Sequence, residues 1–285
     1  MKRILKSRPG RSALGNGGNI LFLSICGIFM ILPMLFIISN AFKPLDELFI
    51  YPPRLIVQNP TMDNFSALKT VFSDSLVPFP RYLYNTVFIT VITTILKVIV
   101  ATMAGYVLEK KRFPGRKFIF KMVITAMLFT SAVTAIPNYL ILSKLGWINS
   151  YLSIVIPALG ASFGVFLVKQ FMVNIPNTIL EAARVDGASE HRIFWRMVVP
   201  NVKPAWLTLV IFTVQDMWSE TGGTYIYSEE LKTLQTALNQ IVSSGISRTG
   251  VSAAISLIMM IIPITVFILS QKNVVETMMS SGIKE

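Results

Sequence analysis

Two residue types that build most metal and catalytic sites are nearly missing from this chain of 285 residues. Cysteine and histidine occur once each, as Cys26 and His191. A single cysteine excludes an intrachain disulfide and a cysteine-based zinc site, and a single histidine argues against a histidine-rich metal site. We therefore expect no metal site. A membrane enzyme is also disfavoured, because the apolar segments offer only Asp216 and scattered serine and threonine as reactive groups.

Charged residues are scarce as well. They make up 14% of the chain, against about 25% in soluble domains. Hydrophobic residues make up 53%, and the mean hydropathy is +0.62. Such a chain lacks the polar surface that a water-soluble exterior needs. Disorder is excluded because it requires low hydrophobicity and high charge. The composition therefore predicts a protein whose solvent is mostly lipid.

A phosphate-binding loop of the form G-x4-G-K-[S/T] is absent from the whole sequence. In proteins that have it, the backbone N–H groups and the lysine of this loop hold the phosphates of a nucleotide. Its absence predicts that this chain does not hydrolyse ATP. The chain is expected not to be an enzyme, and any energy from ATP must come from a partner.

Six segments are long and apolar enough, or nearly so, to cross a bilayer as helices of about 20 residues. They are residues 20–39, 82–108, 118–142, 150–168, 204–218 and 251–271. The fifth is the weakest, because Gln215 and Asp216 interrupt it. Prolines lie inside four of the spans, where neighbouring groups can bind the carbonyls that proline leaves free. The prediction is an all-α polytopic membrane protein with residues 1–285 in a single transmembrane domain.

The basic residues indicate how the spans are oriented. Sixteen lysines and arginines lie in the leading segment, the second-to-third loop, the fourth-to-fifth loop and the tail, whereas seven lie in the alternate loops. Because lysine and arginine are enriched in cytoplasmic loops, both termini are predicted to be cytoplasmic. The net charge of +12 is then a sign of topology and not of nucleic-acid binding. The first span is too long for a signal-peptide core, so we expect a retained anchor.

Two connecting segments have a distinct character. The extracytoplasmic segment 43–81 is rich in proline, which blocks regular helix, and is expected to form a packed, irregular loop. The polar tail after Gln271 is expected to be a frayed terminus.

The longest cytoplasmic loop, residues 174–203, carries signals for two short helices. Thr178 followed by Glu181 has the spacing of a capping box. Gly187 is expected to stop this first helix, because glycine adopts positive φ without steric cost. Ser189 is expected to cap a second helix with Glu190 in its first turn. Pro200 is expected to end that helix.

Two interpretations of this loop remain open from its residues alone. In the first, it is a docking surface, where Ala182 and Ala183 allow close approach of another backbone and Arg184 and Asp186 orient it. The residues Ile193 to Trp195 would then anchor the second helix. In the second, the loop is a capped connector in the membrane interface, and Glu181 only caps a helix.

The same residues resemble a known family signature. Glu181-Ala182-Ala183, three residues, Gly187, nine residues and Met197-Val198-Val199-Pro200 are similar to the motif EAA-x3-G-x9-I-x-L-P. That motif belongs to inner-membrane permeases of binding-protein-dependent ABC importers. Met197 and Val199 depart from it conservatively. The run from Glu181 to Ser189 resembles the carbohydrate-uptake branch, in particular the second permease of maltose-type importers. Weaker similarities lie at residues 104–106, 112–117, 212–218 and 232–234.

The resemblance implies a MetI-like permease fold with a cytoplasmic coupling helix. It implies that a separate ATPase, which binds ATP and magnesium, grips the loop; this chain itself would carry no cofactor. The other implied partners are a second, different permease, which would form a heterodimer with this chain, and an extracytoplasmic solute-binding protein. This chain is expected to lie in the cytoplasmic membrane and not to bind nucleic acid. The residues implied to contact the ATPase are Glu181, Ala182, Ala183, Arg184, Asp186, Gly187, Ala188 and Ser189.

The implied function is import of a sugar or oligosaccharide by alternating access, with this chain forming half of the pathway. A permease for a non-sugar solute is an alternative within the same family. A secondary transporter that works without an ATPase is disfavoured, because no inverted repeat of the spans is visible.

Two charged residues lie inside predicted spans. Lys97 and Asp216 both fall near mid-depth when helix rise is counted from the ends of their spans. Charges at that depth are costly and usually face a cavity or the protein interior. One interpretation is that Gln215, Asp216 and Trp218, together with Lys97, line the solute pathway. The other is a structural pair that joins helices or meets the second permease.

Overall fold

The computed structural model describes residues 13–73, 77–160, 162–243, 245 and 248–281. In this part of the chain all regular structure is helical. Four helices are long and apolar enough to cross a membrane, or up to six if each of two bent helix pairs is one span. The predicted all-α membrane architecture is thus confirmed. The basic residues at positions 2–11, which contributed to the predicted orientation, lie outside the described residues, as does the end of the tail at 282–285.

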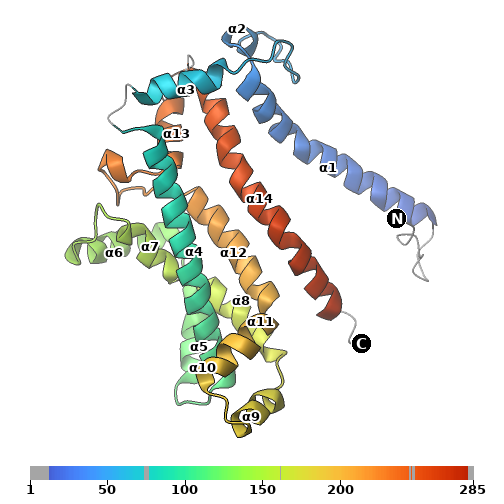
Figure 1. The fold of residues 1–285 in the computed structure, drawn as a ribbon, viewed down its shortest axis with the longest axis vertical. Helices are drawn as coiled ribbons and strands as arrows, with labels where there is room; N and C mark the ends of the chain where they lie inside the picture. The colour runs from blue at the N-terminus through green and yellow to red at the C-terminus, as the bar shows by residue number, and fades with distance from the viewer. Residues whose placement is uncertain (1–12, 74–76, 161, 244, 246–247, 282–285) are drawn as a thin grey trace. The chain divides into compact units, whose positions relative to one another are not determined.

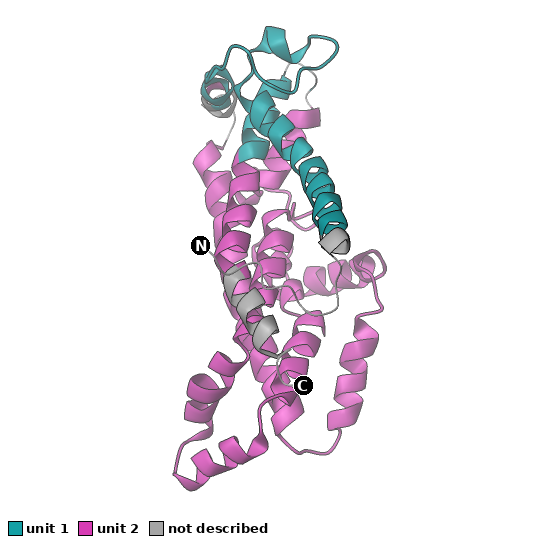
Figure 2. Cartoon of the chain, turned by 90° about the vertical axis from the view of Figure 1, so that its right-hand side faces the viewer, with its two compact units in different colours: residues 1–69, 244–257 teal, residues 70–243, 258–285 magenta. Residues whose placement is uncertain are grey.

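The chain divides into two compact units (Figure 2). The first comprises residues 1–69 and 244–257, and the second comprises residues 70–243 and 258–285. The prediction of one domain stays a prediction. The helices, in chain order, are α1 (Ala13–Phe42), α2 (Leu45–Leu48), α3 (Asp63–Ser73), α4 (Phe79–Lys110), α5 (Arg116–Ala126), α6 (Ser131–Lys144), α7 (Leu152–Leu159), α8 (Ser162–Val173), α9 (Asn177–Val185), α10 (Glu190–Ile193), α11 (Val199–Asn201), α12 (Lys203–Trp218), α13 (Leu234–Ser243) and α14 (Thr249–Ser281).

In the first unit, polar side chains hold the segment after α1. The Lys43 ammonium group is buried and donates to the Asn40 side chain (2.8 Å) and to the Arg54 carbonyl. The buried Glu47 carboxylate accepts the Gln58 backbone N–H at 2.9 Å. These bonds replace the backbone pairing that the prolines prevent. The segment is held at these points, but residues 51–56 are all exposed, and it includes α2 and α3, so it is neither packed nor irregular throughout.

In the second unit, α4 is the central helix, and α7, α8 and α12 pack against it (Figure 1). Two glycines allow the close approach of these helices. A Cβ on Gly105 of α4 would lie 3.2 Å from both the Lys169 backbone nitrogen and a Val168 methyl group of α8. A Cβ on Gly164 of α8 would lie 3.0 Å from both Leu209 methyl groups of α12. The backbones of α4 and α8 therefore lie close together at Gly105, and the Leu209 side chain of α12 packs directly on the α8 backbone at Gly164.

The third predicted span, 118–142, is not one straight helix. It coincides with α5 and α6, which are bent by 110° at a short break. The break ends at Thr130, whose extended backbone (φ −79°, ψ 156°) cannot continue α5 and instead begins α6. Pro137 follows inside α6. All four predicted intramembrane prolines, Pro33, Pro137, Pro157 and Pro263, do lie inside helices.

The contact at Gly105 yields a stability prediction. Gly105→Val is expected to lower the unfolding free energy by about 1–3 kcal/mol, because the added methyl groups overpack the α4–α8 contact. Gly27→Val in α1 is the matched control, since a Cβ there would meet nothing within 4 Å. Thermal unfolding of the purified protein in detergent measures the difference. Equal melting temperatures for the two variants would contradict the close packing.

Candidate functional site

Helix α9 begins one residue before the predicted capping box. Its N-cap is Pro176, which makes no side-chain cap bond, and Asn177 is the first helical residue. The predicted box of Thr178 and Glu181 is therefore wrong. The reason is local: proline has a fixed φ of −63° here and admits a helix directly after it, so Thr178 lies already inside the first turn.

The predicted end of α9 at Gly187 is confirmed. Gly187 has φ +78°, and the Ala188 N–H donates to the Ala183 carbonyl at 2.9 Å. The Gly187 N–H donates to the Arg184 carbonyl at 3.0 Å. These two bonds form a Schellman motif, and the two alanines pack together with the hydrophobic core beneath them. The turn between α9 and α10 is thus fixed by backbone geometry.

Ser189 caps α10 as predicted, and its hydroxyl accepts the Arg192 N–H at 3.3 Å. Pro200, expected to end this helical segment, lies in its last turn, and the segment ends one residue later, at Asn201. A π-helical turn at Phe194–Val198 widens the helix, and the Val199 N–H donates to the Phe194 carbonyl five residues earlier. The chain then continues as α11 and bends by 75° into α12. Proline has no N–H, so in a regular α-helix it leaves the carbonyl four residues earlier without a donor. In the π-helical turn the N–H groups bond to carbonyls five residues earlier, which changes the carbonyl that is left without a donor and accommodates Pro200.

The predicted docking residues share an outward surface at one end of the second unit (Figure 1). Glu181, Ala182, Arg184 and Asp186 are exposed, and the neighbouring Val185 is 88% exposed. Ala183 and Ala188 are half-buried. The inner side of the same loop is firmly packed, since Leu180 and Ile193 are buried in a core cluster with α4, α8 and α12 residues.

One carboxylate, that of Glu190, ties this loop to the end of α4. It accepts from the Tyr106 hydroxyl at 2.8 Å, forms an ion pair with Lys111 at 2.6 Å and pairs with Arg184 at 2.8 Å. The hydrogen bond from Lys111 lowers the pKa of Glu190 to about 2, together with those from Arg184 and Tyr106 and against partial desolvation. Arg184, expected to orient a partner, lies against Glu190. We call these four residues the Glu190 clamp.

Two further residues at the end of α4 bind neighbouring elements. The Lys110 ammonium group donates to the Ile175 carbonyl at 2.6 Å and to the Asn177 side chain at 3.2 Å, just at the start of α9. Glu109 pairs with Lys169 of α8 at 2.9 Å. These contacts and the clamp were not predicted from the sequence, because the basic residues of this region indicated only the topology.

Lys97 and Asp216 line one cavity of about 330 Å³ in the second unit. This agrees with the similar depth that the rise per helical residue predicted for them. The other two predicted pathway residues do not line it. Gln215 is exposed, and Trp218 is 2% exposed and donates its indole N–H to the Met259 carbonyl at 2.8 Å. Trp218 therefore forms a structural contact between α12 and α14.

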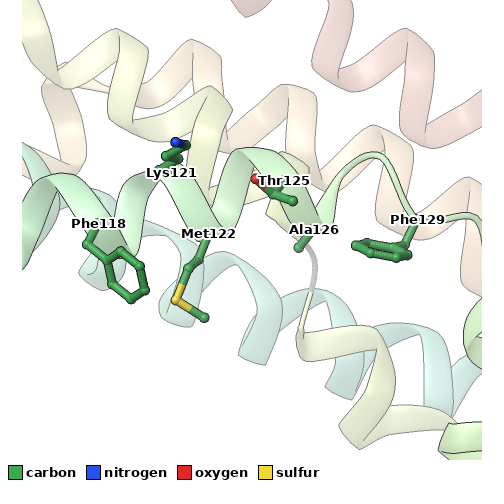
Figure 3. Close-up of a pocket in the computed structure, with 6 residues that line it drawn as sticks. All are labelled: Phe118, Lys121, Met122, Thr125, Ala126 and Phe129. Carbon is green, nitrogen blue, oxygen red and sulfur yellow. The ribbon is translucent and has the colours of Figure 1, made fainter.

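A second hollow, of about 410 Å³, lies on α5 and is mostly apolar (Figure 3). Phe118 and Met122 point to the same side of the helix, and Lys121 and Thr125 are its polar residues. No residue of α5 itself is buried. This hollow offers few groups to bind a polar solute, whereas the cavity at Lys97 offers both a donor and an acceptor.

Comparisons with known proteins give a consistent result. The family model described as “Binding-protein-dependent transport system inner membrane component” matches residues 97–279. The chain is 32% identical to the Bacillus subtilis protein LplC over 78% of this chain and 74% of LplC. It is 25% identical to the arabinooligosaccharides transport system permease protein AraQ of Bacillus subtilis, over 93% of this chain and 94% of AraQ.

Solved structures support the same fold. A chain of a bacterial ABC transporter that imports the acidic polysaccharide alginate superposes with a TM-score of 0.80 at 24% identity, covering 93% of this chain and 99% of that chain. A chain of the MetNI methionine ABC transporter gives a TM-score of 0.50 at 15% identity, covering 68% of this chain and 93% of that chain.

Because the Glu190 clamp ties the loop to α4, we expect removal of the Glu190 charge to loosen the loop. Glu190→Gln is expected to weaken loop anchorage by about 1 kcal/mol, a modest value because the carboxylate is 48% exposed. Amide hydrogen exchange in α9 and α10 should become about fivefold faster. Glu181→Gln is the control, since no described residue donates to that carboxylate in the structure. Unchanged exchange in Glu190→Gln would contradict the clamp.

The low pKa of Glu190 sets the pH at which the clamp opens. A carboxyl whose pKa falls on folding stabilises above its unfolded value, near 4.5, and the stabilisation is lost as the pH falls toward 2. A spin label on Val185→Cys in a Cys26→Ser background should keep its mobility from pH 8 to pH 5 and gain mobility between pH 4.5 and 2. In Glu190→Gln the label should be mobile throughout. A transition near pH 6 in the wild-type background would contradict this assignment.

Proposed function

The chain belongs to the family of inner-membrane components of binding-protein-dependent transport systems, and from this we propose that α9 and α10 couple a separate ATPase to a sugar pathway. As a member of that family it is a transport subunit and not an enzyme. The surface formed by residues 177–189 is the part that the ATPase would contact. The observation that carries this proposal is the contrast between the exposed outer side of α9 and its clamped inner side.

The outer side of α9 has the chemistry of a docking surface. Val185, the last residue of α9, is 88% exposed, and Ile179, in its first turn, is 50% exposed. Large apolar side chains exposed on a short helix favour a protein partner. Ala182 adds no bulk, and Glu181 and Asp186 supply charge at the rim. A cleft in an ATPase that receives one short helix fits this surface.

The inner side of the loop has the rigidity that a lever requires. Leu180 of α9 and Ile193 of α10 are fully buried in a cluster that includes Val168 of α8 and Leu209 of α12. The Glu190 clamp adds a polar link to α4. Because close-packed interiors transmit displacement, a movement of α9 would be passed to α4, α8 and α12 together. These helices also line the cavity at Lys97.

The solute class is taken from the relatives. AraQ is named for arabinooligosaccharides, and a further Bacillus subtilis relative is named a polygalacturonan/rhamnogalacturonan transport permease. We propose a sugar or oligosaccharide as the solute here, delivered by an extracytoplasmic solute-binding protein. ATP and magnesium would be bound by the ATPase. A second, different permease would complete the pathway, and both termini of this chain would be cytoplasmic.

Gly187 provides the test of coupling. Gly187→Val is expected to reduce ATP-driven sugar uptake at least tenfold while membrane insertion stays normal. There is open space around the position, so the effect comes from its φ of +78°, which costs a β-branched residue about 1–2 kcal/mol or more and distorts the end of α9. Gly187→Asn is the matched control, because asparagine tolerates this backbone region.

Uptake is measured in proteoliposomes that contain the complete transporter, and ATPase retention is measured by co-purification. Normal uptake by a correctly inserted Gly187→Val variant would contradict coupling through α9. Uphill sugar transport by the purified chain alone would contradict the need for an ATPase.

A further inference from the structure

The cavity at Lys97 lies where interrupted helices end. Helix α5 ends at Ala126, α7 ends just before Gly160 and α8 begins at Ser162, and all three of these residues line the cavity. Lys97 of α4 and Asp216 of α12 contribute the charges. Irregular backbone at membrane depth is tolerated where it is buried in protein or lines a polar cavity. The remaining lining residues are Met127, Phe163, Gly164, Leu209 and Phe212.

Lys97 is a buried charge that makes no direct contact with an acceptor among the described residues. It is 8% exposed and lines the cavity, but no described residue accepts a hydrogen bond from it or forms a direct ion pair with it. Asp216 is close enough to interact with it electrostatically across the cavity. A buried ammonium group without acceptors is unfavourable. Lys97 and Asp216 therefore present a donor and an acceptor to whatever fills the space between them.

The charges of the cavity are balanced within the protein. The carbonyl ends of α5 and α7 carry partial negative charge and stabilise the Lys97 ammonium group. The first N–H groups of α8 carry partial positive charge and favour the Asp216 carboxylate. An additional carboxylate in the cavity would be attracted by Lys97 but repelled by Asp216, which lines the same space. This arrangement favours an uncharged solute that both accepts and donates hydrogen bonds.

The apolar part of the cavity has the shape for a ring. Phe163 of α8 and Phe212 of α12 both line it, and their rings meet edge to face with centroids 5.8 Å apart and an angle of 78°. They are 42% and 45% exposed, so their free surfaces are available to a ligand. The C–H face of a pyranose is apolar and fits an aromatic surface, whereas its hydroxyl groups point sideways toward polar partners.

Buried hydroxyl groups without partners lie one helical turn from each charged residue. Thr93 precedes Lys97 by four positions on the same face of α4, and Thr213 precedes Asp216 by three positions on α12. Both hydroxyl groups are fully buried and have no hydrogen-bond partner. The two helices pack against each other. The α4–α12 contact next to the cavity thus contains polar hydroxyl groups. A contact that only joins two helices would not need these hydroxyl groups.

We propose that this cavity holds one uncharged sugar ring, with Lys97 donating to its hydroxyl groups, Asp216 accepting from them and Phe212 lying on its apolar face. The volume of about 330 Å³ is at the lower end for ligand sites and is enough for one ring. The site selects neutral rings over uronates. This inference rests on the proposed function and adds the charge class of the solute.

The experiment uses the complete transporter with a reporter in the cavity. Met127, which lines the cavity, is changed to cysteine in a Cys26→Ser background, and its reaction rate with a neutral methanethiosulfonate is followed by mass spectrometry of this chain. The probes are the methyl glycoside of galactose and its C6 uronate, which share the ring and differ only at C6, where one carries a neutral hydroxymethyl group and the other a carboxylate. The neutral glycoside should slow labelling at least fivefold at a concentration where the uronate slows it less than twofold.

Lys97→Met and Asp216→Asn should each abolish protection by the neutral glycoside. Asp216 is exposed, so its variant keeps the fold even if Lys97→Met does not. Lys121→Met is the matched control, because Lys121 lines only the hollow on α5. Protection retained in Asp216→Asn, equal or stronger protection by the uronate, or no protection by either probe would overturn the assignment.

Uptake separates this outcome from the fate of the proposed function. If the wild-type complex imports a sugar but the reporter shows no preference for the neutral ring, the cavity assignment fails and the proposed function stands. If the complex imports only a solute that is not a sugar, the proposed function fails.

Discussion

The Glu190 carboxylate is the interaction on which the arrangement of the α9–α10 loop depends. Three donors from two places in the sequence meet on it: Tyr106 and Lys111 from the end of α4, and Arg184 from α9. Without it, α9 would be a short helix joined to the bundle only through apolar contacts on its inner side. With it, a charged link also joins α9 and α10 to the end of α4. The exposed outer side of α9 is useful as a docking surface because the inner side is held in this way.

Local signals were the ones that the sequence predicted well. Gly187 and Ser189 act through their own backbone neighbours, and both ended and began helices where expected. Thr178 misled, because Pro176 offered a helix start one residue before Thr178 could act as a cap. Pro200 marked the end of its segment to within one residue, but the π-helical turn before it was not predicted. Neither the start at Pro176 nor the π-helical turn is visible in a motif considered alone.

Contacts between residues distant in the sequence were predictable only where a large free-energy cost, such as that of a charge in the bilayer, required them. Lys97 and Asp216 are 119 positions apart, yet the cost of charge in a bilayer indicated that both face a shared interior, and they do. Tyr106 and Glu190 gave no such sign, because either residue is acceptable at a water-facing helix end. Trp218 was predicted to line the solute pathway and does not line the cavity. Its indole N–H donates to the Met259 carbonyl, a contact that the sequence does not reveal. The break between α5 and α6 was likewise missed, since both halves are apolar.

The π-helical turn at Phe194–Val198 has a consequence for the whole fifth span. Its wider bonding keeps the segment helical up to Asn201, so the 75° bend falls at Val202, directly after Pro200 and Asn201. The span that carries Asp216 therefore starts at Lys203, at a corner whose inner residues Val198 and Val202 are fully buried. The turn thus determines where the chain leaves the cytoplasmic loop and starts the helix that brings Asp216 to the cavity.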